Sequence, residues 1–292
     1  MSAPITGHVS FEHAVNWPED LEELHEESSR THFIDVWTRR AMLARLGPLS
    51  AVPTVIDVGC STGYLLDDLR RAIPAVRLIG VDLVAGGLRK AHAKLPEAVL
   101  LQADVCALPL EDASVDAAMS ANLLEHVPDD EQALSEVFRI LRPGARAAIV
   151  VPVGPGNYDY YDRLLGHERR YARGELARKA AAAGFEVLED FHLGALLYPA
   201  FWAVKQRNRR RYGHLQGAAL EDKVRADIEG TSDSACGHLA CRIEEWMLAH
   251  RVKLPLGIRG LTVLERPRER ARAFRDAPRV CRAHQRVRVE KC

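Results

Sequence analysis

The sequence predicts an α/β fold in which a doubly wound, mostly parallel sheet carries helices on both faces. The first observation is that residues 53–152 alternate strand and helix patterns five times without a break. The second is that aspartate, asparagine or glycine residues follow these strands directly, at the sheet edge where such folds bind ligands. The third is that two later strand patterns, at 185–191 and 252–267, bring the sheet to seven strands.

The elements are expected in the following order. Strands are predicted at 55–58, 76–81, 98–102, 115–121 and in the apolar part of 141–152, before the two later ones. Helices are predicted at 16–46, from Gly63 onward, and at 84–95, 134–141 and 175–183, because apolar residues recur there at helical spacing. A proline in the first turn after Asn16 and the Gly47–Pro48 pair bound the first helix.

A glycine turn between the first strand and its helix indicates a small-molecule site. Asp57, Gly59 and Gly63 punctuate the stretch VIDVGCSTGYLL, and helix spacing begins directly after Gly63. A helix N-terminus offers free N–H groups, and glycine lets a ligand approach the backbone closely. The G-x-G-x-x-G fingerprint of dinucleotide sites is absent, which argues against a redox enzyme with a nucleotide cofactor.

Acids at the next two strand ends extend this site. Asp82 stands about 20 residues after the glycine turn, the spacing at which an acid accepts hydrogen bonds from ribose hydroxyls. Asp104 ends the third strand, where its carboxylate can accept from an adenine amino group. A turn or helix-capping aspartate is the alternative reading of Asp104.

The D-x-G-x-x-x-G pattern of Asp57, Gly59 and Gly63, taken with Asp82, resembles the first motifs of class I S-adenosylmethionine methyltransferases. The resemblance covers roughly residues 30–267 and implies a Rossmann-like, seven-stranded sheet whose last strand is antiparallel. It implies S-adenosylmethionine as the cofactor. The cofactor-binding residues that it implies are Asp57, Gly59, Cys60, Ser61, Gly63, Asp82, Leu83, Asp104, Val105 and Asn122. Ser61 replaces a glycine that many members have.

Within that family, SANLLEH after the fourth strand resembles the small-molecule methyltransferases of the ubiquinone-biosynthesis type. The Asn/Asp-Pro-Pro-aromatic tetrad of enzymes that methylate adenine or glutamine nitrogen is absent. The resemblance implies a small-molecule acceptor, and we expect a hydrophobic or aromatic one with an acidic or phosphorylated group, methylated on oxygen rather than on nitrogen or carbon. His167, in GHERRY, is the first candidate for a catalytic base and His126 the second; a structural role is the alternative for His126. A non-catalytic scaffold and a macromolecular acceptor remain the alternative functions.

Around that acceptor, four aromatic residues and two arginines are expected to form the walls. Tyr160, Tyr161, Phe201 and Trp202 would supply apolar surface. Arg169 and Arg170 would either bind an anionic acceptor or pair with acids of the domain itself.

Charge, cysteine content and apolar runs indicate the cellular compartment and the kinds of partner. Net charge is zero over 292 residues, which gives no indication of specific nucleic-acid binding. Six cysteines without a C-x-x-C pair predict free thiols in a cytoplasmic protein, and no metal ligands are expected. The longest apolar run, about 14 residues at 191–204, is too short to span a bilayer, although peripheral membrane contact stays open. The oligomeric state is not predicted.

The sequence predicts three regions along the chain. Residues 1–50 are expected to form an N-terminal helical cap, which either covers the cofactor or packs on the sheet edge. Residues 51–267 form the methyltransferase domain, with 193–252 as an insertion. That insertion is read as a buried helix with a basic end, with a surface-lying helix and an acceptor lid as alternatives. Residues 268–292, rich in arginine and poor in apolar residues, are expected to be disordered.

Overall fold

The computed structural model describes residues 30–229, 234–250 and 252–268. Seven strands form one sheet in the order β3-β2-β1-β4-β5-β7-β6. The strands are β1 Thr54–Val58, β2 Arg77–Asp82, β3 Val99–Gln102, β4 Val115–Ala121, β5 Leu141–Pro152, β6 Glu186–Leu193 and β7 Arg259–Glu265. Strands β1 to β5 pair in parallel, and β7 lies antiparallel between β5 and β6. The predicted doubly wound, seven-stranded fold is confirmed.

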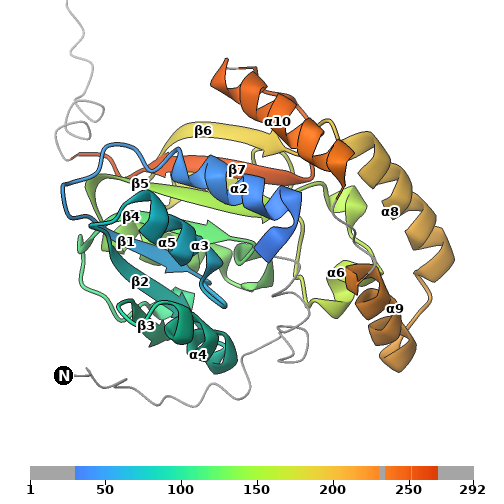
Figure 1. Ribbon diagram of the computed structural model, residues 1–292, viewed down its shortest axis with the longest axis horizontal. Helices are drawn as coiled ribbons and strands as arrows, with labels where there is room; N and C mark the ends of the chain where they lie inside the picture. The colour runs from blue at the N-terminus through green and yellow to red at the C-terminus, as the bar shows by residue number, and fades with distance from the viewer. Residues whose placement is uncertain (1–29, 230–233, 251, 269–292) are drawn as a thin grey trace, which may run out of the picture.

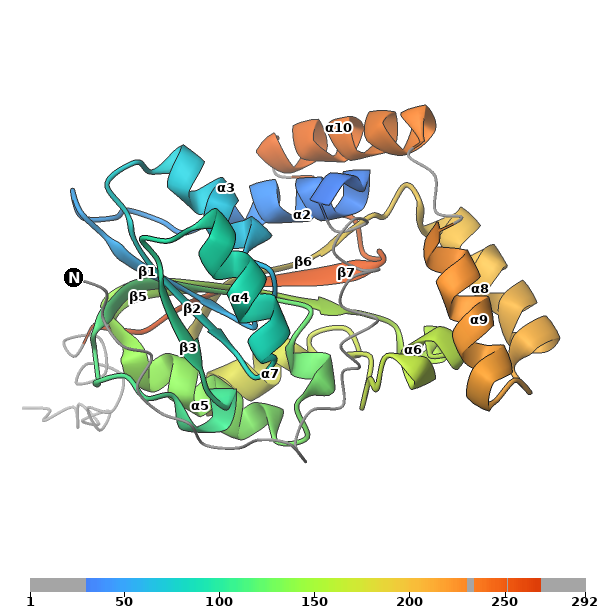
Figure 2. The ribbon, with the colours of Figure 1, turned by 60° about the horizontal axis from the view of Figure 1, so that its bottom comes forward.

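Helices cover both faces of this sheet (Figures 1 and 2). One face packs against α2 Phe33–Leu43, α3 Tyr64–Ala72 and α4 Ala85–Lys94, and the other against α5 Asp130–Ile140 and α7 Glu175–Ala182. Alternate residues of β5 enter the two cores: Ile149 and Val151 face α5, whereas Ala148 and Val150 face α2. Burial of both faces explains why β1, β4 and the second half of β5 are largely apolar on both sides rather than alternating.

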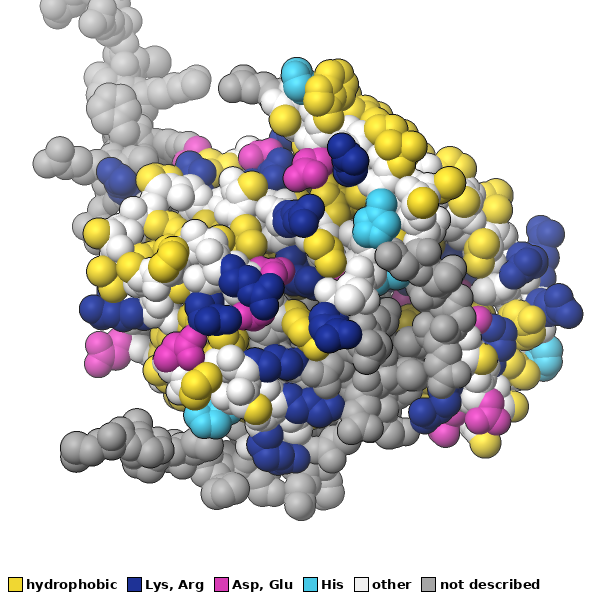
Figure 3. Space-filling view, viewed as in Figure 1, with side chains coloured by type: hydrophobic (Ala, Val, Ile, Leu, Met, Phe, Trp, Pro, Cys, Tyr) yellow, Lys and Arg dark blue, Asp and Glu magenta, His cyan; other side chains and the backbone are white. Residues whose placement is uncertain are grey.

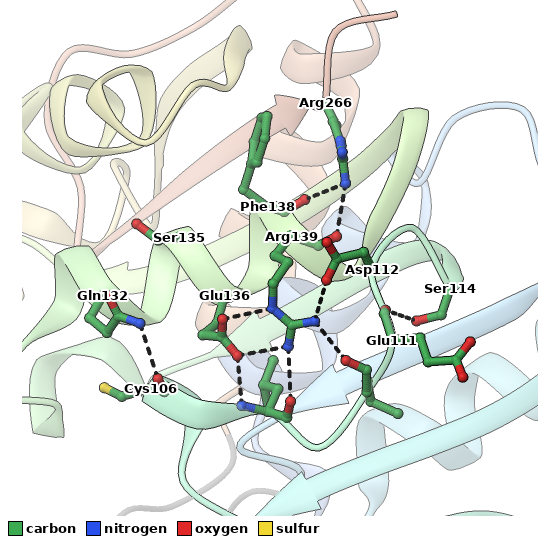
Figure 4. A network of polar contacts seen from close by, with 12 residues as sticks. Cys106, Glu111, Asp112, Ser114, Gln132, Ser135, Glu136, Phe138, Arg139 and Arg266 are labelled. Atoms are coloured by element: carbon green, nitrogen blue, oxygen red, sulfur yellow. Dashed lines mark hydrogen bonds and ion pairs between the residues drawn. The ribbon is translucent and has the colours of Figure 1, made fainter.

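The connection after β3 is held in place by a network around Arg139 of α5 (Figure 4). The Arg139 guanidinium donates to the carbonyl oxygens of Leu108 and Leu110 and pairs with Glu136 at 2.8 Å. Glu136 in turn accepts from the backbone N–H of Leu108 at 2.8 Å. This network positions the short 3₁₀ helix η1 (Val105–Ala107), which carries the candidate residue Val105.

Three further helices lie at the end of the sheet where β5 and β6 finish. They are α6 Tyr160–Leu164, α8 Tyr198–Tyr212 and α9 Gly217–Glu229, and a small core of Tyr160, Leu220 and Val224 joins α6 to α9 (Figure 2). Strand β6 runs parallel to β5, since both are antiparallel to β7, so both strands end at the same sheet edge. The segments after them therefore lie at the sheet edge that also carries the glycine turn.

The insertion differs from the buried helix that the sequence analysis favoured. That prediction is wrong, because Lys205 is the one buried residue of α8, whereas Trp202 is 50% exposed. Helix α10 (Ala235–Ala249) packs on α2 and leaves Leu239, Ile243 and Trp246 exposed on its other side. Figure 3 shows the resulting apolar surface over α10 and α8. Among the described helices, none combines the length and apolar composition that a membrane span requires.

The first predicted helix is observed in part. Helix α2 contributes Ile34, Trp37 and Met42 to the core, and Arg259 of β7 bonds its Asp35 and Thr38. Residues 16–29 of the predicted helix and the basic tail at 269–292 lie outside the described residues.

Candidate active site

The glycine turn lies between β1 and α3 and is tied to the end of β2. Backbone N–H groups of Gly59 and Cys60 both donate to the carbonyl oxygen of Val81, at 2.8 and 3.0 Å. Gly59, Ser61 and Gly63 all have positive φ, at 80°, 45° and 84°. A positive φ is unusual for serine, and such backbone persists only where the surroundings enforce it. The turn is therefore a preformed, sharply curved cradle at the N-terminus of α3.

The two glycines are needed for packing as well as for the turn. A Cβ on Gly59 would lie 2.9 Å from Cδ1 of Leu123, and one on Gly63 would lie 3.0 Å from the Cβ of Ala91 in α4. The side chain of Cys60 is buried and lies close to Gly80, so only the backbone of Cys60 lines the turn. The crowding by Leu123 and Ala91, together with the positive φ, explains why glycine stands at both positions.

Asp82 connects the turn to the end of β2. One carboxylate oxygen accepts from the Ser61 N–H at 2.8 Å, and the other accepts from the Val84 N–H at 2.9 Å. Leu83 between them is fixed through its carbonyl oxygen, which accepts from the Gln102 side chain at 2.9 Å. A carboxylate has about four lone-pair sites, and Asp82 uses two of them to hold the positive-φ Ser61 and the start of α4.

Asp57 is the buried acid of the site. It is 2% exposed, and its Oδ1 atom has no hydrogen-bond partner within the described structure. Burial, reinforced by the neighbouring charge of Asp82 and opposed by Arg39, raises the pKa of Asp57 to about 8. A cationic group beside this buried carboxyl would stabilise its ionised form.

Asp104, Val105 and Asn122 lie at the ends of β3 and β4. One oxygen of Asp104 caps η1 by accepting from the Cys106 N–H at 2.8 Å. The helix-capping role that the sequence analysis gave as the alternative is therefore observed for that oxygen. Val105 is buried at the start of η1. Asn122 has a φ of 52°, and its N–H donates to Val150 across the sheet. Positive-φ backbone thus occurs at the ends of both β1 and β4.

Buried polar atoms without partners concentrate at this edge. Of the five such side-chain atoms in the described residues, three belong to Asp57, Ser120 and Glu125, which lie on or directly after β1 and β4. An unsatisfied buried polar atom costs about 1–3 kcal/mol, which a bound polar ligand recovers. Most of the unsatisfied buried side-chain atoms of the described residues thus gather at this edge.

His167 is held by a buried acid that the sequence analysis did not identify. Asp162 of α6 is fully buried, and its Oδ1 lies 2.8 Å from Nδ1 of His167. Arg170 donates to the same oxygen at 2.8 and 2.7 Å. Although burial acts to raise it, the bonds from His167 and Arg170 hold the pKa of Asp162 well below its usual range. Asp162 is therefore an acceptor, so Nδ1 of His167 carries a proton, and in the neutral imidazole Nε2 keeps the lone pair.

His126 lies directly beside His167, with ring centroids 4.6 Å apart in an edge-to-face arrangement. Glu125 precedes it on the 3₁₀ helix η2 (Leu124–His126) and is 1% exposed. Burial raises the pKa of Glu125 to about 7, which His167 and Arg170 partly oppose. Sequence reasoning missed Glu125, although its position beside His126 was the available signal. The structure thus brings both candidate bases together, 41 positions apart in sequence.

The predicted acceptor walls are only partly suited to that role. Arg170 is paired with Asp162, and Arg169 donates to the carbonyl oxygens of Val127 and Pro128 at 2.6 and 2.9 Å. Of the two alternatives, pairing within the domain is the one observed. Tyr160 is buried and bonds Asp227. Tyr161 and Phe201 are partly buried and both lie near Lys205, at 5.4 and 5.7 Å from its Nζ.

The fold and the site together define a domain of the S-adenosylmethionine-dependent methyltransferase class. The strand order with an antiparallel seventh strand, the glycine cradle and the acids at the ends of β1 and β2 are its features. Residues 56–149 match the family described as methyltransferase domain, and this part of the chain belongs to it.

Similar proteins agree with this assignment. A probable S-adenosylmethionine-dependent methyltransferase of Mycolicibacterium smegmatis is 34% identical over 159 residues, covering 52% of this chain and 60% of the relative. The trans-aconitate 2-methyltransferase of Azoarcus is 39% identical over 138 residues, covering 47% and 53%. The chain thus spans a little over half the length of these two relatives. Phosphoethanolamine N-methyltransferase 2 of Haemonchus contortus, solved with S-adenosylmethionine, shares the fold (TM-score 0.61, 16% identity, 90% and 61% covered).

Proposed function

We propose that this protein binds S-adenosylmethionine in the glycine cradle and methylates a hydroxyl group of a small hydrophobic or aromatic molecule. The observation that carries the proposal is the grouping of Asp57, Asp82 and the positive-φ turn at one sheet edge, beside the His126–His167 pair. The relative named for trans-aconitate supports a small organic acceptor.

The cofactor side follows from the chemistry of the residues. S-adenosylmethionine carries its methyl on a sulfonium, so the leaving group is neutral and transfer requires mainly alignment. The buried Asp57, whose Oδ1 has no hydrogen-bond partner in the described residues, suits the ammonium of the cofactor, and Asp82 suits its ribose hydroxyls. Leu83, Val105 and Asn122 would border the adenosine, with Asp104 as the acceptor for its amino group.

His167 is the proposed base for the hydroxyl proton. Its Nδ1–H is fixed on Asp162, which leaves Nε2 to accept, and the imidazole is only 9% exposed. A neighbouring carboxylate also stabilises the imidazolium that forms when the proton arrives. Asp162 is thus the positioning residue, and His126 lies beside the ring as a second proton carrier. Because Arg169 and Arg170 are engaged by the protein, the proposal does not require an anionic acceptor.

Cofactor binding is tested by calorimetric titration of S-adenosylmethionine into wild type and Asp82→Ala. Loss of the acceptor should weaken binding about 10- to 150-fold, or 1.5–3 kcal/mol, because charge-assisted hydrogen bonds are lost. Glu97→Ala, at a side chain 54% exposed, is the matched control and should bind like wild type. Equal affinity in folded Asp82→Ala would place the ribose elsewhere.

Methyl transfer is tested with tritiated S-adenosylmethionine and a small-molecule extract, with label followed into the organic phase. His167→Ala should lower kcat about 100- to 10,000-fold with little change in cofactor affinity. The loss should shrink at high pH, where the acceptor ionises without a base. Full turnover of His167→Ala at every pH would make His167 structural.

A further inference from the structure

We infer that Glu125, His126 and His167 form a binding site for one divalent transition-metal ion of the Zn²⁺ type. One carboxylate oxygen of Glu125 and one ring nitrogen of each histidine lie within 4.8 Å of one another. Two imidazoles and a carboxylate are a ligand set that such ions accept, with further coordination positions left open. Ligand atoms around zinc stand roughly 3–3.5 Å apart at Zn–N and Zn–O distances near 2.1 Å. Side-chain rotations of the three residues would bring their ligand atoms from within 4.8 Å to this separation.

The buried carboxylate is the first independent support. Glu125 is 1% exposed, and its Oε2 atom has no hydrogen-bond partner in the described residues. A buried carboxylate without a donor is unfavourable unless a cation or a donor satisfies it. Within the described part of the chain, Glu125, His126 and His167 are the one group that meets the geometric requirement for three ligands.

The environment of His167 is the second support. Metal-bound histidines donate their other ring nitrogen to a carboxylate or carbonyl, which fixes the tautomer and makes the ligand nitrogen more basic. Asp162 has this relation to His167, with a 2.8 Å contact from Nδ1 to a fully buried carboxylate. Nε2 is consequently the nitrogen available to an ion.

Nearby positive charge does not oppose an ion here. Arg170, a buried cation whose charge acts on Glu125, is compensated by its two contacts with Asp162. Lys205 is compensated by Asp159, whose Oδ1 lies 2.8 Å from its Nζ. The cluster itself follows β4 by a few residues, so the ion would stand at the same sheet edge as Asn122.

The consequence for catalysis rests on the proposed function, but the metal site itself does not. With the ion bound, Nε2 of His167 is a ligand and no longer a base. An acceptor hydroxyl on an open coordination position would then have its pKa lowered by the ion instead. The metal-loaded protein should therefore need less alkaline pH for methyl transfer than the metal-free protein.

The test is titration of chelator-treated, full-length protein with Co²⁺ and Zn²⁺, followed by visible absorption and calorimetry without S-adenosylmethionine. One Co²⁺ per chain should bind with ligand-field bands typical of nitrogen and oxygen ligands. Glu125→Gln and His126→Gln should each lower affinity at least tenfold. Asp162→Asn, which removes only the positioning contact, should lower it about 10- to 100-fold.

His92→Gln, an exposed histidine on α4, is the matched control and should keep wild-type affinity. Because His126 is not fully buried, His126→Gln should disturb folding less than a change at Glu125. The melting temperature of the metal-free variant checks that it is folded. Unchanged stoichiometry and affinity in both His126→Gln and Glu125→Gln, or sulfur-type charge-transfer bands, would overturn the site. Either result leaves cofactor binding, measured separately, unaffected.

Discussion

The buried acid of the cradle makes cofactor affinity dependent on pH in a defined direction. With a pKa of about 8, Asp57 is ionised in about one molecule in a hundred at pH 6 and one in ten at pH 7. If the ionised form is the one that pairs with the ammonium of the cofactor, affinity should rise about tenfold, or 1.4 kcal/mol, per pH unit below 8. The rise should level off above pH 8, where Asp57 is already ionised.

Calorimetry at pH 6 and 7 checks this, since an α-amino group with a pKa near 7.7–8.0 stays mostly protonated there. S-adenosylhomocysteine, which carries the same amino-acid group, is a suitable ligand. Buffers of different ionisation enthalpy should reveal close to one proton released per ligand at pH 7. Asp57→Asn should bind more weakly and lose the slope, whereas Glu97→Ala should retain it. A flat affinity in wild type, or the same slope in Asp57→Asn, would refute the reasoning.

Two further predictions concern stability. Gly63→Ala should cost about 1–3 kcal/mol by thermal denaturation, because φ is 84° and the new Cβ would lie 3.0 Å from that of Ala91; an unchanged melting temperature would contradict this. Tyr171→Phe should cost about 1.5–3 kcal/mol, since the buried hydroxyl lies 2.6 Å from Asp130, and should lower Tm by about 2–4 °C per kcal/mol. Cofactor affinity should not change in Tyr171→Phe, and a large loss would show that Tyr171 acts on the cradle.

The cofactor side could be predicted from sequence because its residues follow strand ends. Gly59, Asp82 and Asn122 each stand next to an apolar run, and parallel strands end at one edge of a sheet. Periodicity therefore located the strands and the sheet edge at which these residues meet. What it did not give was the reason for the glycines, because Leu123 and Ala91, which crowd them, come from other parts of the chain.

The acceptor side was less predictable because it depends on contacts between distant, irregular segments. No spacing rule connects Glu125 with His167, or assigns Asp162 to the histidine five positions later. Arginine in the GHERRY stretch indicated anion binding or internal pairing equally well, and only the position of Asp162 decides between them. The insertion was misjudged for the same reason, since an apolar run such as 197–204 does not reveal which neighbours cover it.

The antiparallel β7 also determines the order in which the sheet can form during synthesis. Among the described residues it is the last strand, yet it lies between β5 and β6 and is the one strand that pairs with β6. A nascent chain that has emerged only to residue 250 therefore displays two open edges, at which other polypeptides can add. Closure awaits residues 259–265, after which Arg266 reaches back to carbonyl oxygens at the end of α5.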